Sequence, residues 1–314
     1  MKTLITGGTG LLGSEFKNVD QNCILIGSKD VDLNHYQGAL NFFEKSHAIG
    51  VRRIIHCAAK VGGLGANLQD PVYFFEENVR INSNVLKAAA KTKIQVVSVL
   101  STCVYPDQKY VKYPLTEDQL HIGPPHQSNF GYAYAKRMLE VQSRAYRQQH
   151  LCNFISVIPN NLYGPNDNYD LESSHVIPAL IRKFYEAKLY GYNHVDVWGT
   201  GAPLREFTFA RDAAKIILWL AENYDGEEPV NIGNPEQISI MNLVIAIAEE
   251  IGFKGDVVFD NTKPDGQYKK PSSNAFLRSL GCDIQCTPLR DGLKETINSF
   301  KNRYPNVRGV TISK

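Results

Sequence analysis

The sequence predicts an α/β protein built on a doubly wound parallel β-sheet, with a smaller C-terminal domain. A short β-type segment, residues 2–6, runs directly into a glycine-rich turn and then a helical segment. Apolar segments of strand length follow at residues 23–26, 53–59, 96–100 and 154–158, and helical patterns separate them. Strands that alternate with helices form parallel sheets covered by helices on both faces. The 314 residues suffice for one large domain or two modest ones.

The composition excludes several classes of protein. Hydrophobic residues make up 43% and charged residues 21%, and a net charge of +2 gives no basic field that would indicate nucleic-acid binding. The first strand begins near the N-terminus and no segment approaches 18 apolar residues, so we expect no signal peptide, no membrane span and a cytoplasmic location. The six cysteines are dispersed, which favours reduced thiols. Cys282 and Cys286 are the only close pair and have no accompanying ligands, so we expect no metal site.

Three glycines follow the first strand at the spacing of a dinucleotide-binding turn. Gly7 permits a tight turn, Gly10 permits close approach of a diphosphate to the backbone, and Gly13 permits close packing of helix on strand. The N-terminus of the following helix offers free N–H groups to phosphates. This order of strand, glycine turn and helix predicts a Rossmann-type fold that binds a dinucleotide.

The end of the second strand indicates which dinucleotide is bound. Ser28 and Lys29 stand where an acidic residue would hold the ribose of NAD, and they suit a 2′-phosphate instead, unless Lys29 is only a surface charge. We therefore predict NADP(H), with Asp32 and Leu33 near the adenine. Further residues expected to line the cofactor come from the glycine turn and from the small residues after the third strand: Thr9, Leu11, Leu12, Ala58 and Ala59.

Ser101 and Cys103 follow the apolar segment 96–100. Ligands of open parallel sheets bind at the carboxyl ends of strands, so a hydroxyl and a thiol at this position are placed for chemistry. In an extended strand these side chains would share one face, about 6 to 7 Å apart. The alternative is that the serine and a small buried cysteine are structural residues at the end of the strand, with no part in catalysis.

Tyr132 and Lys136 lie one turn apart on a predicted helix from about 132 to 150. A lysine charge beside a phenol is expected to lower the pKa of the phenol, as a proton donor near neutral pH requires. Tyr105 and Lys109 have the same spacing, but Pro106 between them indicates a loop. Tyr132 and Lys136 are therefore the preferred pair.

Other candidate groups lie beyond residue 165. His175 is a possible acid or base because its ordinary pKa is near neutral, although a histidine there can also be structural. Arg205 can hold a diphosphate with its fork of donors, or can pair with Glu206. The basic loop 263–271 can bind an anion or simply be solvated.

The glycine turn, the strand-end serine and the later Tyr-x-x-x-Lys helix together resemble the extended short-chain dehydrogenase/reductase superfamily. Within it, the chain is similar over nearly its whole length to the GDP-L-fucose synthase family. Cys103 and His175 distinguish this family from ordinary nucleotide-sugar epimerases. The segments that carry the resemblance are AAKVGG at 58–63, STCVYP at 101–106, NLYGP at 161–165, SHVIP at 174–178, VWGTG at 197–201 and KPDG at 263–266.

The resemblance implies a bifunctional enzyme that uses NADPH to convert GDP-4-keto-6-deoxy-D-mannose to GDP-L-fucose. Cys103 and His175 would invert carbons 3 and 5 as an acid–base pair, a thiolate base and an imidazolium acid. Tyr132 would donate the proton in the reduction of carbon 4, Lys136 would tune it and anchor the ribose, and Ser101 would hold the carbonyl. One ketone would thereby activate both reactions.

The resemblance also implies binding residues, a domain division and an assembly. Residues 1–165, with a returning segment near 201–233, would bind NADP(H), and 166–314 would mainly bind the substrate. Helices 71–91 and 130–150 would pair in a homodimer. Further cofactor contacts would come from Asn161, Leu162 and His175 beside Tyr132 and Lys136. Substrate contacts would come from Asn161, Arg182, Lys183, Trp198, Arg205 and Lys270.

Two alternatives remain open from the sequence. One is a redox-neutral, NAD-dependent nucleotide-sugar epimerase or dehydratase on the same fold. The other is a non-catalytic NADP-binding regulatory protein, since a fold does not fix a function.

Overall fold

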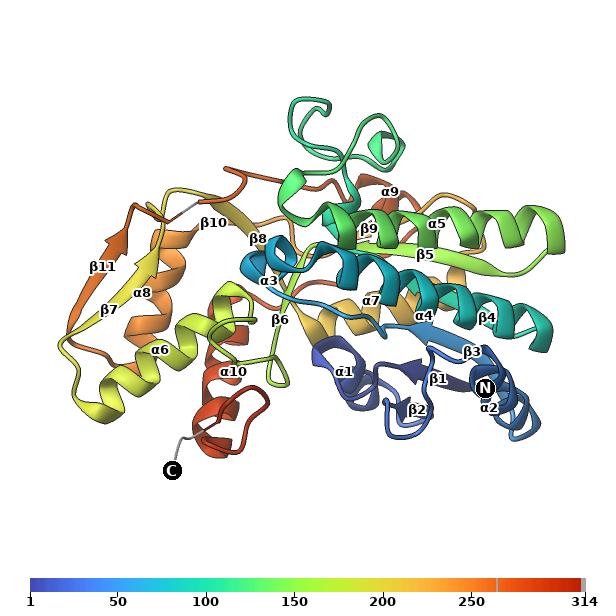
Figure 1. The fold of residues 1–314 in the computed structure, drawn as a ribbon, viewed down its shortest axis with the longest axis horizontal. Helices are drawn as coiled ribbons and strands as arrows, with labels where there is room; N and C mark the ends of the chain where they lie inside the picture. Colours follow the sequence, from blue (N-terminus) through green and yellow to red (C-terminus); the bar gives the residue numbers. More distant parts are fainter. Residues whose placement is uncertain (264, 312–314) are drawn as a thin grey trace.

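A parallel six-stranded sheet forms the centre of the larger part of the chain (Figure 1). The computed structural model describes residues 1–263 and 265–311, so Pro264 of the segment 263–266 and residues 312–314 lie outside the described residues. The strand order is β2-β1-β3-β4-β5-β9, and every neighbouring pair is parallel. This confirms the predicted doubly wound parallel sheet. Its strands are β1 (Lys2–Thr6), β2 (Cys23–Ile26), β3 (Val51–His56), β4 (Gln95–Val99), β5 (Phe154–Pro159) and β9 (Val230–Ile232).

Helices cover both faces of this sheet because each presents an apolar face to it. Phe43 of α2, Val85 of α4 and Leu139 of α5 are fully buried on one face. Phe16 of α1 and Ile217 of α7 are fully buried on the other. Since β2 and β3 lie on opposite sides of β1, the chain reverses direction there, and such a switch point leaves a crevice at the carboxyl ends of the strands. The helices are α1 (Leu11–Val19), α2 (Tyr36–Ala48), α4 (Pro71–Thr92), α5 (Phe130–His150), α7 (Ala210–Asn223) and α9 (Ala275–Ser279).

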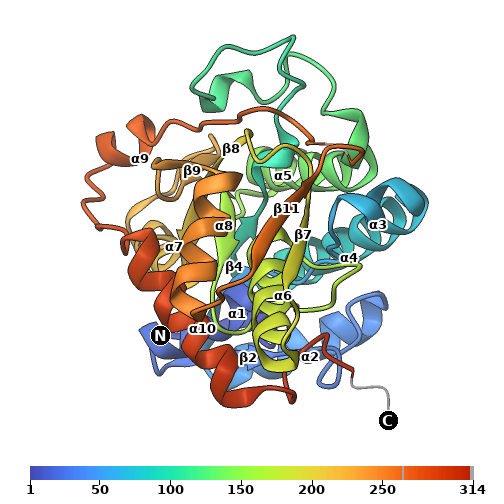
Figure 2. The same cartoon turned by 90° about the vertical axis from the view of Figure 1, so that its left-hand side faces the viewer.

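The smaller part of the molecule has its own core beside the carboxyl ends of the sheet (Figures 1 and 2). Phe184, Leu243, Ile247 and Phe300 are buried there without measurable exposure. β7 pairs with β11, and β8 lies between β6 and β10. The elements of this part are β6 (Asn161–Tyr163), α6 (Val176–Tyr190), β7 (His194–Trp198), β8 (Leu204–Phe209), β10 (Gln237–Ser239), α8 (Ile240–Ile251), β11 (Asp256–Asp260) and α10 (Leu289–Arg303).

Four further short helices lie in the connections between the longer elements. Residues 106–129 form the long loop that the sequence predicts, and two of these helices lie within it. Tyr105, just before this loop, is buried and donates to Asn231 at 2.8 Å, so its hydroxyl makes a structural contact. The four are α3 (Leu64–Gln69), η1 (Thr102–Val104), η2 (Glu117–Gln119) and η3 (Gln127–Asn129).

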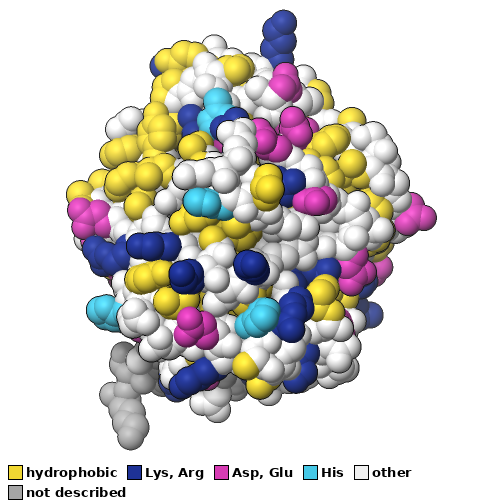
Figure 3. Space-filling model, turned by 90° about the vertical axis from the view of Figure 1, so that its right-hand side faces the viewer, with side chains coloured by type: hydrophobic (Ala, Val, Ile, Leu, Met, Phe, Trp, Pro, Cys, Tyr) yellow, Lys and Arg dark blue, Asp and Glu magenta, His cyan; other side chains and the backbone are white. Residues whose placement is uncertain are grey.

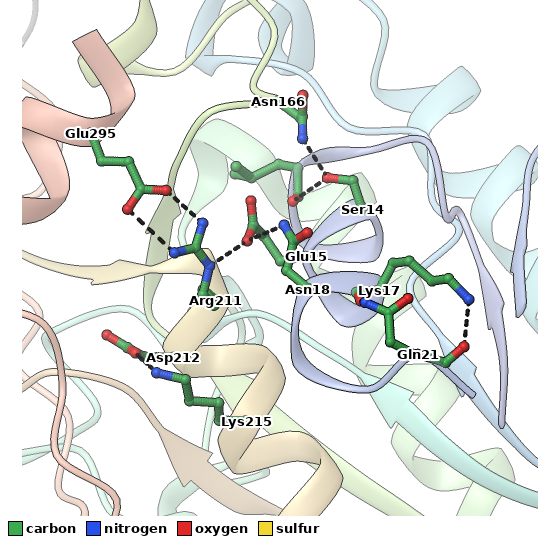
Figure 4. A network of polar contacts seen from close by, with 11 residues as sticks. Ser14, Glu15, Lys17, Asn18, Gln21, Asn166, Arg211, Asp212, Lys215 and Glu295 are labelled. Carbon is green, nitrogen blue, oxygen red and sulfur yellow. Dashed lines mark hydrogen bonds and ion pairs between the residues drawn. The ribbon is translucent and has the colours of Figure 1, made fainter. Parts of the chain in front are cut away.

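Arg211 of α7 joins the two parts of the molecule (Figure 4). Its guanidinium contacts Glu15 of α1 at 3.0 Å and Glu295 of α10 at 2.5 Å. Asn166, in the connection after β6, donates to Ser14 of α1 at 2.9 Å. Because Glu15 is buried, this ion pair is poorly screened by water. The smaller part is thereby fixed against the helix that follows the glycine turn.

Most element boundaries agree with the sequence prediction. α4 begins where expected, because Asp70 accepts from the backbone N–H of Tyr73 at 3.1 Å and Pro71 occupies the first helical position. β3 ends earlier than predicted, at His56, so residues 57–60 are irregular. All six cysteines are free thiols. Among the described residues, no helix is long and apolar enough to cross a membrane.

Candidate active site

A cavity of about 780 Å³ lies at the carboxyl ends of the central strands. It extends from the glycine turn past β4 to the beginning of α6. A second cavity, of about 310 Å³, lies beside it under the loops 126–129 and 265–270. The two cavities therefore form one site with two compartments. The chemically active residues that line both are Ser101, Tyr132, Asn161, His175 and Arg205.

The glycine turn fits a dinucleotide diphosphate. Gly7 has a φ of +68°, and its backbone oxygen accepts from the N–H of Gly10 at 3.0 Å. A Cβ on Gly13 would overlap that oxygen, and one on Gly10 would lie 3.3 Å from it. α1 begins at Leu11 with no side-chain cap, so its first N–H groups are available to an anion.

Most predicted cofactor residues line the larger cavity, including Ser28. Lys29 does not line it and is exposed, so 2′-phosphate recognition by this side chain stays a prediction. Asn161 also donates to the backbone oxygen of Glu206 at 2.8 Å, which orients its side chain. The other predicted residues in the cavity wall are Thr9, Leu11, Leu12, Asp32, Leu33, Ala58, Ala59 and Leu162.

Ser101 and Cys103 are held together by a turn. Ser101 caps η1, and its Oγ accepts from the backbone N–H of Cys103 at 3.4 Å. The expectation of an extended strand through Cys103 is wrong, because β4 ends at Val99 and residues 102–104 are 3₁₀-helical. Burial raises the pKa of the Cys103 thiol, while the Lys270 ammonium and a hydrogen bond from Ser101 oppose this rise.

Tyr132 and Lys136 lie on α5 beneath the same crevice. The Lys136 ammonium donates to the backbone oxygen of Val99 at 2.7 Å and lies 6.0 Å from the centre of the Tyr132 ring. Burial and the nearby Cys103 raise the pKa of Tyr132 well above its ordinary value. The pKa of Tyr132 is therefore not lowered as predicted, because burial dominates it and the nearby Cys103 acts in the same direction. Burial also lowers the pKa of Lys136 to about 8.

His175 immediately precedes α6 and reaches both cavities. Desolvation lowers its pKa from the ordinary value. Burial thus favours the neutral imidazole at His175 and the neutral thiol at Cys103. The predicted thiolate and imidazolium forms are opposed by the same physical effect at both residues.

Comparison with known proteins identifies the family. The model of the NAD-dependent epimerase/dehydratase family matches residues 3–233. GDP-L-fucose synthase of Dictyostelium discoideum is 42% identical over 97% of both chains, and that of Escherichia coli is 33% identical over 98% of this chain and 99% of the other. The crystal structure of a GDP-L-fucose synthetase from Naegleria fowleri bound to NADP has a TM-score of 0.90 and 41% identity, over 98% of this chain and 94% of that one. The chain belongs to the GDP-L-fucose synthase family.

Three of the predicted substrate residues of this GDP-L-fucose synthase family member line the smaller cavity: Asn161, Arg205 and Lys270. Arg205 donates to the backbone oxygens of Leu204 and Asp265, at 2.8 and 3.4 Å. It does not pair with Glu206, whose carboxylate instead accepts from Ser272 at 2.8 Å. Burial lowers the pKa of Lys270, in the same cavity wall, to about 8.

Three predicted substrate residues, Arg182, Lys183 and Trp198, line neither cavity. Arg182 pairs with Glu186 at 2.8 Å and donates to the backbone oxygen of Gly309 at 3.0 Å. Lys183 donates to the backbone oxygen of residue 196 at 2.9 Å. Trp198 is 61% exposed, outside the crevice. The structure therefore brings Asn161, Arg205 and Lys270 to the site but holds these three elsewhere.

Several polar residues of the site were not predicted from the sequence. Among the described residues, Asn34 Oδ1, Asp167 Oδ2 and Ser174 Oγ are buried without a hydrogen-bond partner, and all three line the larger cavity. Asn67 Oδ1 is likewise unpartnered in the wall of the smaller one. Buried polar groups normally have partners, so these atoms suit contacts with a bound molecule. Asn34, Asp167 and Ser174 resemble ordinary turn residues and Asn67 lies in the short helix α3, so the sequence carried no signal for them.

Proposed function

We propose that this chain converts GDP-4-keto-6-deoxy-D-mannose to GDP-L-fucose in the presence of NADPH. The observation that carries the proposal is the position of Ser101, Cys103, Tyr132 and His175 around two adjoining cavities, one of them built on the glycine turn. Membership of the GDP-L-fucose synthase family supports the same conclusion. When bound, NADPH supplies the hydride for the carbon-4 ketone.

Epimerisation needs two groups, because inversion requires a proton to leave one face of a carbon and return to the other. Cys103 and His175 come from separate elements and reach the same cavity, so they can act from different sides. Carbons 3 and 5 flank the ketone, which acidifies their C–H bonds. The hydroxyls of Ser101 and Tyr132 would stabilise the resulting enolate oxygen by donating hydrogen bonds.

Reduction requires a proton donor for the oxygen at carbon 4. Tyr132 suits this role because burial keeps its phenol protonated until the oxygen becomes basic. Lys136 is fixed by its bond to Val99, so its positive charge stays in place as the proton leaves Tyr132. Ser101 holds the same oxygen in both reactions.

The GDP moiety needs cations in the outer compartment. Arg205 and Lys270 line the smaller cavity, and we assign to them the diphosphate of the sugar nucleotide. Residues 1–165, with the segment near 201–233, would bind NADPH, and residues 166–314 would mainly bind the sugar nucleotide. Remote binding of GDP would retain the sugar between epimerisation and reduction.

The exposed faces of α4 and α5 support the predicted homodimer. They carry Val72, Tyr73, Tyr134, Met138 and Val141, each more than a third exposed. Figure 3 shows hydrophobic side chains gathered along its left-hand side, where these two helices lie. A two-fold dimer would bury this face against its copy. Light scattering should give twice the mass of 35.2 kDa, and Met138→Glu should shift the protein to the monomer; a monomeric wild type contradicts the assembly.

The function is tested by incubating the purified chain with GDP-4-keto-6-deoxy-D-mannose and NADPH in D₂O. We expect one NADPH oxidised per sugar and GDP-L-fucose labelled with deuterium at carbons 3 and 5. Isomerisation without NADPH consumption would establish the redox-neutral epimerase instead. Binding of NADPH without any turnover would favour the regulatory protein, and either result overturns the proposal.

A further inference from the structure

Arg308, in the segment after α10, lines the larger cavity although it lies in the smaller part of the chain. Its Nη1 is 4.0 Å from the position that a Cβ on Gly10 would occupy. Within residues 1–263 and 265–311, its guanidinium makes no hydrogen bond or ion pair. A guanidinium whose donors have no partner in this described part of the chain therefore lies beside the glycine turn.

The backbone that carries Arg308 is firmly held. The backbone oxygen of Arg308 accepts from the N–H of Tyr169 at 2.9 Å, and that of Gly309 accepts from Arg182 at 3.0 Å. Gly309 has a φ of +84°, and a Cβ there would overlap Asn168. The segment thus passes close against the loop 168–170 in a conformation that favours glycine. Arg182, predicted to bind substrate, instead helps to hold this segment.

We propose that Arg308 binds the diphosphate of the dinucleotide together with the glycine turn. The inference rests on the proposed function only for the identity of the cofactor as NADPH. The turn and the start of α1 supply backbone N–H groups, and a guanidinium adds paired donors whose geometry matches phosphate oxygens. Proximity to Gly10, at the diphosphate position of such turns, favours this group over the 2′-phosphate.

Asp167 offers a competing explanation for Arg308. It is 5% exposed, lines the same cavity, and its Oδ2 has no partner among the described residues. Arg308 would then serve only to neutralise this buried carboxyl group. The two explanations predict different behaviour when Asp167 is replaced by asparagine, because a counter-ion is no longer needed once the carboxyl group is gone.

The test measures the Kd of NADPH and of NADH for the full chain by titration calorimetry, without any sugar substrate. Arg308→Gln should weaken binding of both dinucleotides about tenfold or more, since charge-assisted hydrogen bonds are lost. Arg308→Lys should recover part of the loss. Arg290→Gln, which removes an exposed cation from α10, should leave both Kd values unchanged. The unfolding temperature of each variant shows whether it is folded.

Three results would overturn the inference. If folded Arg308→Gln binds both dinucleotides as tightly as wild type, Arg308 does not contact the diphosphate. Weaker binding of NADPH alone assigns Arg308 to the 2′-phosphate. Disappearance of the effect in an Asp167→Asn background makes Arg308 the counter-ion of Asp167. Because binding is measured without the sugar, a failed turnover assay would not be mistaken for any of these results.

Discussion

Lys136 and Tyr132 share one face of α5, yet the Lys136 ammonium is bonded to Val99, 6.0 Å from the centre of the Tyr132 ring. Burial therefore dominates the pKa of Tyr132 and raises it. A phenol in this state is an acid that retains its proton until an alkoxide forms beside it. In the proposed reduction, this protonated state suits Tyr132 as the proton donor and not as a resting phenolate.

Tyr132→Phe should therefore lower the reduction rate by about 10²- to 10⁴-fold, the usual contribution of a general acid. NADPH oxidation at saturating substrate measures this loss. Deuterium exchange at carbons 3 and 5 should persist at a reduced rate, because in the proposed mechanism Ser101 would still donate to the carbonyl oxygen. Tyr134→Phe, two residues away on the exposed face of α5, is the matched control and should behave as wild type. A reduction rate within threefold of wild type would show that Tyr132 is not the proton donor.

Cys103→Ser should abolish deuterium exchange at carbons 3 and 5, because a hydroxyl is a far weaker acid than a thiol and does not supply the base. The NADPH Kd should change little, since Cys103 lines the smaller cavity and not the larger one. Cys152→Ser, at the loop after α5, is the control. Exchange at wild-type rate in Cys103→Ser would assign the base elsewhere.

The sequence predicted which residues lie at the site better than it predicted their protonation. Residue type and spacing singled out Tyr132, Lys136 and the cysteine at the strand end, because these features are local, and all three line the two cavities. The pKa of each group depends on desolvation by side chains distant in sequence, such as Lys270 beside Cys103. Local spacing therefore could not reveal that burial favours the neutral thiol, or that η1 replaces the expected strand.

Lys270→Gln should raise the pKa of the Cys103 thiol further, because it removes the cation that most opposes the effect of burial. The rate of alkylation by iodoacetamide, measured from pH 6 to 10, should therefore rise at a higher pH than in wild type. Lys269→Gln, an exposed neighbour, should leave the alkylation profile unchanged. Arg205, Glu206, Lys136, Arg137 and Tyr132 also face this region and remain present in both variants. An unshifted profile in Lys270→Gln would contradict the electrostatic role.

The pH dependence of exchange at saturating substrate distinguishes the two possible forms of Cys103. The pKa of Cys103 is raised and that of His175 is lowered, so at a pH between these two values the neutral thiol and the neutral imidazole predominate. If the reactive forms are instead the thiolate and the imidazolium, only a small fraction of the enzyme is active in this pH range. Raising the thiol pKa by Lys270→Gln would then lower the maximum exchange rate between the two pKa values and shift the alkaline side of the rate–pH profile to higher pH. If the thiol acts as the acid and the imidazole as the base, the alkaline side of the profile would shift in the same way, but the maximum exchange rate would stay unchanged.

Sequence similarity placed Arg182, Lys183 and Trp198 at the substrate, whereas the structure places them outside both cavities. Arg182 belongs to the contacts that fix Gly309, a relationship across 127 positions that no local pattern indicates. The fold was more predictable, because the strands and the helices α4 and α5 carry continuous apolar patterns. The site combines these elements with loops 126–129, 167–175 and 265–270, whose mutual positions depend on tertiary contacts.

Gly13→Ala should weaken both the fold and dinucleotide binding. A Cβ at this position would overlap the backbone oxygen of Gly7 and lie 2.8 Å from the Cα of Gly8, so the turn or α1 must shift. Overpacking of this kind costs about 1–3 kcal/mol. We expect a lower unfolding temperature and a Kd for NADPH raised at least about tenfold, since a displaced turn no longer presents its N–H groups to the diphosphate. Gly65→Ala is the matched control, because nothing lies within 4 Å of its Cβ and alanine favours the helix α3. Equal stability and equal NADPH affinity in the two variants would show that the turn tolerates a side chain at Gly13 and that close packing there is unnecessary.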